Sequence, residues 1–172
     1  MVDIAISYDG NLRCSATHGP SGATLLTDAP KDNMGSGAAF SPTDLVATAL
    51  GTCVLTTMAI AARQRGIELA GATMRVTKEM VSKPVRRIAR LTVELHIPLE
   101  LPEEQRAALE WVARSCPVHK SMHPDVEMPI AIVWGSRDTT SSEASPNLEL
   151  TIGAHVEQSA EKTPAPTPVS KP

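Results

Sequence analysis

Two cysteines in contrasting surroundings are the residues best suited to chemistry in this sequence. Cys53 lies within a long apolar segment, Leu45–Ala62, and Cys116 is followed directly by Pro-Val-His. A cysteine inside an apolar helix is usually an inert packing residue, whereas a thiol at a helix end beside Pro and His is expected to be accessible. If folding brings the two together, a peroxide could oxidise one thiolate to a sulfenic acid, and the other thiol would capture it as a disulfide.

The bulk composition indicates one ordinary domain. The chain has 172 residues, 42% of them hydrophobic but only 2% aromatic, so we expect a core of small aliphatic side chains, which mildly favours oligomerisation. A formal net charge of −3 argues against a nucleic-acid partner, and three cysteines are too few for a disulfide-stapled fold. No motif indicates a cofactor.

The N-terminus and the long apolar segment bear on where in the cell the protein is expected. The N-terminus lacks the pattern of a signal peptide. Leu45–Ala62 contains four threonines and is near the lower length limit for a membrane span, so we interpret it as a core helix. We therefore expect a cytoplasmic protein without a membrane partner, in a compartment where thiols stay reduced.

The first third of the chain reads as a small β-sheet followed by a long helix. Alternation and turn residues predict three strands and then a loop, at Ile4–Tyr8, Leu12–His18, Ala23–Thr27 and Asp28–Ala39. Ser41 is the predicted N-cap of the helix, with Pro42 at its first position and Asp44 as the acidic half of a capping box. The helix should run to about Arg65 and be covered on nearly all sides.

The remaining elements alternate less regularly. They are strands at Glu68–Val81, Arg87–Ile97 and Ile130–Trp134, and a helix from Pro102 that Pro117 stops at Cys116. Strands and helices segregate, which predicts an α+β domain over residues 1–137. Residues 138–172 read as a low-complexity, flexible tail, with weak alternation at Asn147–His155 that would fit an added strand.

Three motifs, in this order and spacing, resemble the OsmC/Ohr family of small thiol-dependent hydroperoxide-reducing proteins. They are Ser41-Pro42-Thr43-Asp44-Leu45, Ala49-Leu50-Gly51-Thr52-Cys53 and Cys116-Pro117-Val118-His119. The resemblance runs from the first hairpin through Trp134. It implies an intertwined homodimer in which antiparallel sheets wrap two long central helices, with active sites at the subunit boundary. It also implies that Cys53 attacks the peroxide and that Cys116 is the resolving thiol.

Two further residues of the family site, an acid and an arginine, have candidate counterparts in this chain. The peroxidase branch carries a Glu that falls at Thr43 here, while the acid of this chain is Asp44, as in an OsmC-like subgroup. The family's N-terminal Arg has a counterpart in Arg13. Asp44 reads first as a helix cap, because at ~100° per residue it lies on roughly the opposite side of the helix from Cys53.

The residue types suggest a role for each candidate residue, and for Cys53 they also allow a purely structural one. Cys53 needs a nearby cation to form a thiolate, for which Arg13 is the first choice; otherwise it is a packing residue. Cys116 at a helix C-terminus suits a resolving thiol, because the dipole there disfavours a thiolate. Cys14 is expected to be a buried strand residue.

Three functions remain open on the sequence alone. The first is a thiol peroxidase that binds an organic hydroperoxide among Phe40, Leu50 and Met58, and that an external dithiol regenerates. The second is a non-enzymatic small-ligand-binding module on the same fold. The third, ranked below redox chemistry, is a metal–thiolate site, whose ligands would be Cys53, Cys116, His119 and His123.

Overall fold

The N-terminal strands form an antiparallel meander in a computed structural model that describes residues 1–136. The strands are β1 (Ile4–Gly10), β2 (Arg13–His18) and β3 (Thr24–Asp28), hydrogen-bonded in the order β1-β2-β3. Asn11 and Leu12, both with positive φ, form the tight turn between β1 and β2. The three strands lie where alternation predicts them. The predictions for residues 138–172, with the strand at Asn147–His155, lie outside the described residues.

The segment after β3 leads into the long helix. It contains one short 3-10 turn, η1 (Lys31–Asn33), and ends at the N-cap of α1 (Pro42–Arg63). The Ser41 side chain accepts the amide of Asp44, and the Asp44 carboxylate accepts the amide of Ser41, so the predicted capping box is confirmed.

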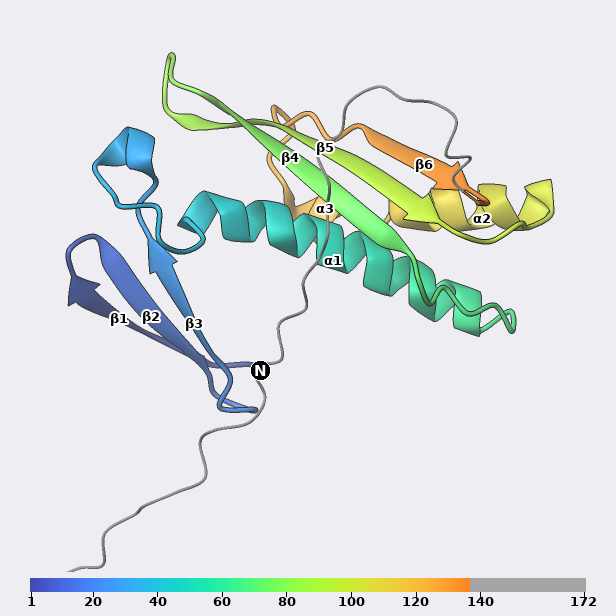
Figure 1. Ribbon diagram of the computed structural model, residues 1–172, viewed down its shortest axis with the longest axis horizontal. Helices are drawn as coiled ribbons and strands as arrows, with labels where there is room; N and C mark the ends of the chain where they lie inside the picture. Colours follow the sequence, from blue (N-terminus) through green and yellow to red (C-terminus); the bar gives the residue numbers. More distant parts are fainter. Residues whose placement is uncertain (137–172) are drawn as a thin grey trace, which may run out of the picture. The chain divides into compact units, whose positions relative to one another are not determined.

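The second sheet lies against α1 and consists of β4 (Thr73–Val81), β5 (Arg87–Ile97) and β6 (Ile130–Trp134). β4 and β5 are antiparallel, whereas β6 joins the other edge of β5 in parallel, a pairing that the sequence did not reveal. β4 also starts at Thr73 and not at Glu68. Figure 1 shows α1 running along one face of this sheet.

Gly51 sets how closely α1 approaches β4. A Cβ atom at this position would lie 2.8 Å from Val76 Cγ2 and 3.2 Å from Met74 Sδ. Real Cβ atoms essentially never approach another atom as closely as 2.8 Å, so any larger residue here would force α1 or Val76 to shift.

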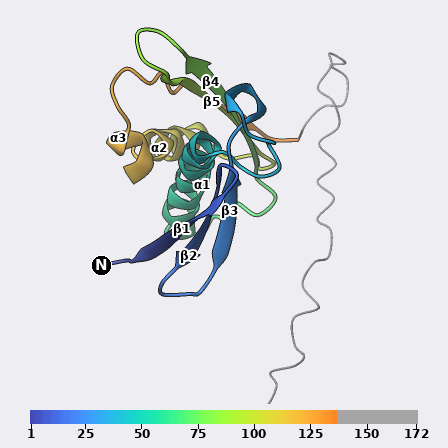
Figure 2. The same cartoon turned by 90° about the vertical axis from the view of Figure 1, so that its left-hand side faces the viewer.

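Two short helices follow β5 and pack beside α1. α2 (Glu103–Ala113) ends before Cys116, and a separate helix, α3 (Pro117–Ser121), begins directly after it (Figure 2). Our prediction of one helix up to Cys116 was therefore wrong. The residue before a proline prefers an extended backbone, and Cys116 adopts one, with φ −63° and ψ 147°. Pro117 thus starts a helix as well as ending the preceding turn.

The core fills the space between one face of α1, the inner face of β5 and helix α2. Its fully buried side chains alternate along β5 and recur at helical spacing along α1: Leu50, Val54, Met58, Leu91, Val93, Leu95, Ile97, Leu109 and Cys116. By length and hydropathy α1 could cross a membrane, but its buried face packs as a core helix does.

The opposite face of α1 is exposed within the single chain. Thr48, Thr52, Thr56 and Ile60 lie on it, and the Ile60 side chain is 57% exposed. The expectation that α1 is covered on nearly all sides is therefore not met by this chain alone. Apolar side chains of β1 are exposed too, with Ile6 at 70% and Tyr8 at 67%.

Candidate functional site

The fold brings Cys53 and Cys116 together from distant parts of the sequence. Cys53 lies on α1, partly buried, with its Sγ 4.0 Å from Thr57 Oγ1. Cys116 lies at the N-cap of α3, which packs on α1. The two side chains are near enough that, after burial, the proximity of Cys53 is a further cause that raises the pKa of Cys116. Both thiols are free.

Cys116 is the buried thiol of the pair. Burial is the largest cause of a raised pKa for Cys116, and the amide of His119, which donates to Cys116 Sγ at 3.4 Å, offsets it only in part. We expected an accessible Cys116 at a helix C-terminus; it is instead wholly buried at a helix N-terminus. Its position still disfavours the thiolate, but by desolvation and not by the helix dipole.

Cys53 is the more exposed thiol, the reverse of what its apolar surroundings suggested. It lies at the margin between the face of α1 that packs on α3 and the face left open in the single chain. A small molecule from solvent therefore reaches Cys53 before it reaches Cys116.

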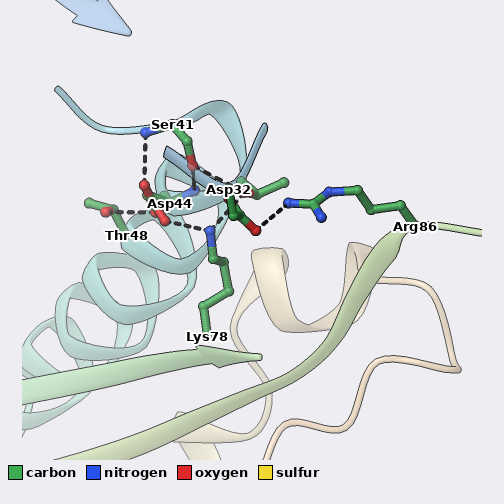
Figure 3. Close-up of polar contacts among 7 residues, drawn as sticks. Asp32, Ser41, Asp44, Thr48, Lys78 and Arg86 are labelled. Atoms are coloured by element: carbon green, nitrogen blue, oxygen red, sulfur yellow. Dashed lines mark hydrogen bonds and ion pairs between the residues drawn. The ribbon is translucent and has the colours of Figure 1, made fainter. Parts of the chain in front are cut away.

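Asp44 has two structural partners at the start of α1. Besides Ser41, its carboxylate binds the Lys78 ammonium, with Nζ 2.5 Å from Oδ1 (Figure 3). The same Nζ lies 2.8 Å from Thr43 Oγ1. Burial raises the pKa of Asp44, but hydrogen bonds from Lys78 and Ser41 outweigh it and hold the pKa below its usual value. The cap interpretation of Asp44 is confirmed.

Lys78 is a residue that the sequence analysis missed. It follows Met74 and Val76 at alternate positions of β4, and these residues face α1 while Arg75 and Thr77 face away. A lysine on the inward face of a strand was the signal, since such a charge needs a partner. A second ion pair, between Arg86 and Asp32 at 3.0 Å, joins the β4–β5 hairpin to η1 close by (Figure 3).

Arg13 lies away from the two cysteines within the chain. Its guanidinium donates to Ser36 Oγ at 3.0 Å and lies 3.8 Å from Asp28 Oδ2. Within residues 1–136 no hydrogen bond or ion pair joins Arg13 to Cys53 or Asp44. Asp28, which is 1% exposed, is the second residue that sequence reasoning missed.

The three side chains expected to bind a hydroperoxide do not form one pocket. Leu50 and Met58 belong to the core and are completely buried, which leaves neither any surface for a ligand. Phe40 is 58% exposed and lines a groove of about 720 Å³ between α1 and β4, together with Leu55 and Met74.

The described residues contain no metal site. Among residues 1–136, no three His, Cys, Asp or Glu side chains gather closely enough to hold a metal ion. Burial lowers the pKa of His119, while His123 Nδ1 lies 3.7 Å from Asp125. The structure therefore gives the metal–thiolate hypothesis no support.

Comparison with known proteins places the chain. The family model described as OsmC-like protein matches residues 35–130. A Psychrobacter arcticus structure, provisionally described as an osmotic stress induced and detoxification response protein, is 42% identical with a TM-score of 0.73, over 77% of this chain and 96% of its own. The chain belongs to the OsmC-like protein family. The predicted α+β fold and family resemblance are thereby confirmed.

More distant structures share the fold of this OsmC-like protein. An organic hydroperoxide resistance protein OsmC from Legionella pneumophila is 18% identical with a TM-score of 0.64, over 77% of this chain and 96% of its own. An organic hydroperoxide resistance protein from Elizabethkingia anophelis is 13% identical, also with a TM-score of 0.64, over 78% and 96%. No curated protein sequence matches the chain.

Proposed function

We propose that this OsmC-like protein reduces organic hydroperoxides through a cycle of two cysteines. The observation that carries the proposal is the pairing of Cys53, which is partly exposed, with Cys116, which is buried beside it. Organic hydroperoxide resistance is also the named role of two proteins with this fold. We place the cycle in the cytoplasm, where dithiol reductants persist.

Each cysteine has one step in the proposed cycle. The Cys53 thiolate attacks the outer peroxide oxygen, the O–O bond breaks, and the alkoxide takes up a proton and leaves as the alcohol. Cys53 is then a sulfenic acid, and the thiol of Cys116 displaces water from it to form the disulfide. An external dithiol reduces the disulfide by thiol–disulfide exchange and is itself oxidised. Because its pKa is raised, Cys116 stays a thiol and does not compete with Cys53 for peroxide.

A homodimer completes the proposed site. The single chain leaves the open face of α1 and the apolar side chains of β1 uncovered, and a three-stranded meander so exposed is poorly stable by itself. A second copy would cover both surfaces. Because Arg13 does not contact Cys53 of its own chain, it would serve Cys53 of the partner subunit, where a guanidinium can hold the thiolate and the peroxide together.

Hydroperoxide consumption by cysteine variants tests the cycle. With cumene hydroperoxide and excess dithiothreitol, wild type should turn over many times, and Cys53→Ser should fall to the uncatalysed rate. Cys116→Ser should accumulate a sulfenic acid on Cys53 that dimedone labels when no dithiol is present. Cys14→Ser, the matched control, should keep the wild-type rate. A Cys53→Ser protein as active as wild type would contradict the proposal.

The groove between α1 and β4 favours a second candidate, a small-ligand-binding module. It has an apolar floor beside the polar groups of Lys78, Asp44 and Thr48, a composition typical of ligand sites. The same assay separates the two functions. A binding module without catalytic activity would bind cumyl alcohol in calorimetry, and the wild-type protein would show no turnover of cumene hydroperoxide. Sustained turnover by wild type would exclude this function.

A further inference from the structure

Arg13 is held on the N-terminal sheet by a small polar network. Arg13 and Asp28 are opposite one another in the β2–β3 ladder. The guanidinium Nη2 donates to Ser36 Oγ at 3.0 Å, and Ser36 Oγ donates in turn to Asp28 Oδ2. Two contacts, one direct at 3.8 Å and one through a hydroxyl, therefore connect the cation to the same carboxylate oxygen.

Asp28 is the fixed end of this network. Its side chain is 1% exposed, and its Oδ2 also accepts the amide of Ala38 at 2.9 Å. A buried carboxylate needs hydrogen-bond donors, and those of Asp28 reach Oδ2, because Oδ1 has no partner among the described residues. The hydrogen bond from Ser36, followed by that from Ala38, outweighs burial and lowers the pKa of Asp28. Asp28 is thus ionised at neutral pH, and it holds Ser36 by a hydrogen bond and Arg13 by an ion pair.

In the part of the chain that the structure describes, the Arg13 side chain has no polar partner other than Ser36 and Asp28. The Arg13 side chain is 51% exposed and lines a cavity of about 460 Å³ with Asn11, Leu12, Met34 and Ser36. Among the described residues, three non-glycine residues have positive φ, and all three line this cavity: Asn11 at 51°, Leu12 at 62° and Met34 at 64°. Such conformations are unfavourable for Leu and Met and persist only where the surroundings impose them.

We propose that Asp28 and Ser36 are positioning residues for Arg13 in hydroperoxide reduction. They hold the Nη2 nitrogen of the guanidinium, so that its other donors stay available to Cys53 of the partner subunit. A guanidinium carries five N–H donors in a rigid fork, and holding one nitrogen restricts where the other donors can point. The inference rests on the proposed function, and in particular on the role of Arg13 across the dimer. The acid that contacts Arg13 in this chain is thus Asp28, whereas the carboxylate of Asp44 binds Lys78 and Ser41.

The rate at which iodoacetamide alkylates Cys53 at neutral pH tests this role, because the rate follows the thiolate fraction. Arg13→Gln should slow alkylation and lower kcat/KM for cumene hydroperoxide by about tenfold or more. Asp28→Asn removes a negative charge, which by electrostatics alone would favour the thiolate and speed alkylation. Positioning through Arg13 predicts the opposite, a slower alkylation and a lower kcat/KM, with no further loss in the Arg13→Gln background.

Milder variants keep the test decisive if Asp28→Asn does not fold. Ser36 is exposed, so Ser36→Ala should fold normally yet reproduce the slower alkylation, and Ser36→Thr should restore the rate. Asp32→Asn is the matched control, because it removes a carboxylate of the same segment that binds Arg86 and not Arg13. It should leave both readouts unchanged.

The outcomes separate this inference from the proposed function. Faster alkylation in Asp28→Asn, or equal losses with and without Arg13, would overturn the positioning role while leaving the cysteine cycle intact. An Arg13→Gln protein with wild-type alkylation and turnover would overturn both the positioning role and the assigned role of Arg13. Absence of hydroperoxide turnover in wild type would overturn the peroxidase proposal. The alkylation rate of Cys53 would then still test whether Asp28 and Ser36 position Arg13.

Discussion

At the scale of single residues, burial separates the two thiols, in the opposite sense to the one that their sequence surroundings suggest. Cys116 is wholly buried and receives one amide, whereas Cys53 lies at the edge of an open helix face. Desolvation disfavours the charged form of a thiol, and the nearby charge of a Cys53 thiolate disfavours it further, so Cys116 ionises with difficulty. The division of roles in the proposed cycle follows from this difference.

The raised pKa of Cys116 predicts a loss of stability at alkaline pH. A group whose folded pKa is raised stabilises the fold fully below its unfolded pKa, here 9.0, and this contribution is lost as pH rises through the folded pKa. Urea unfolding from pH 7 to 10 should show the loss above pH 9, at most about 1.4 kcal/mol per pH unit. Cys116→Val should lose less over the same range; an equal slope in both proteins would contradict the assignment.

At the scale of elements, α1 is positioned by its capping box at one end and by a glycine contact in its middle. Ser41, Asp44 and Lys78 join the start of the helix to β4. Gly51 then lets the helix lie against Val76 and Met74 of the same strand. Because Cys53 is only two residues from Gly51, the same contact sets the position of the Cys53 thiol relative to β4.

Gly51→Ala should destabilise the fold, although alanine is the better helix former. Propensity would favour alanine by about 1 kcal/mol. Its Cβ, however, would lie 2.8 Å from Val76 Cγ2, and overpacking of a core typically costs about 1–3 kcal/mol. Urea unfolding should show a net loss, and Gly51→Ala in a Val76→Ala background should cost less than in wild type. A net gain in stability would show that α1 shifts freely against β4.

At the scale of the whole molecule, the single chain leaves apolar side chains of α1 and β1 exposed to solvent. Ile60 on the open face of α1, and Ile6 and Tyr8 on β1, are each more than half exposed. The core itself lies on the other side of α1, between that helix, β5 and α2. A second copy that covers these surfaces is the assembly that the proposed site requires.

Ile60→Lys should weaken the proposed homodimer. Placing a charge in an apolar interface leaves it without a partner, whereas the same charge on a solvated surface costs little. Light scattering should find wild type as a dimer and Ile60→Lys shifted toward monomer at micromolar concentration. Val133→Lys on the outer face of β6 is the matched control, since Val133 is 56% exposed and Ile60 is 57% exposed. Equal masses for the two variants would place the interface elsewhere.

The amino-acid sequence by itself determined what depends on neighbouring residues. Alternation located the strands of both sheets, Ser41 and Asp44 located the start of α1, and the order of three motifs identified the OsmC-like family. These features are legible because helix caps, turns and strand periodicity act over a few residues.

Only the tertiary structure decided which side chains meet and which are buried. In the folded chain Cys53 is the more exposed thiol and Cys116 the buried one, the reverse of what we expected. Asp44 binds Lys78, and Arg13 contacts Asp28 and Ser36. It also placed Leu50 and Met58 in the core and paired β6 with β5 in parallel. Desolvation and ion pairing depend on every element packed around a group, and those elements come from distant parts of the chain.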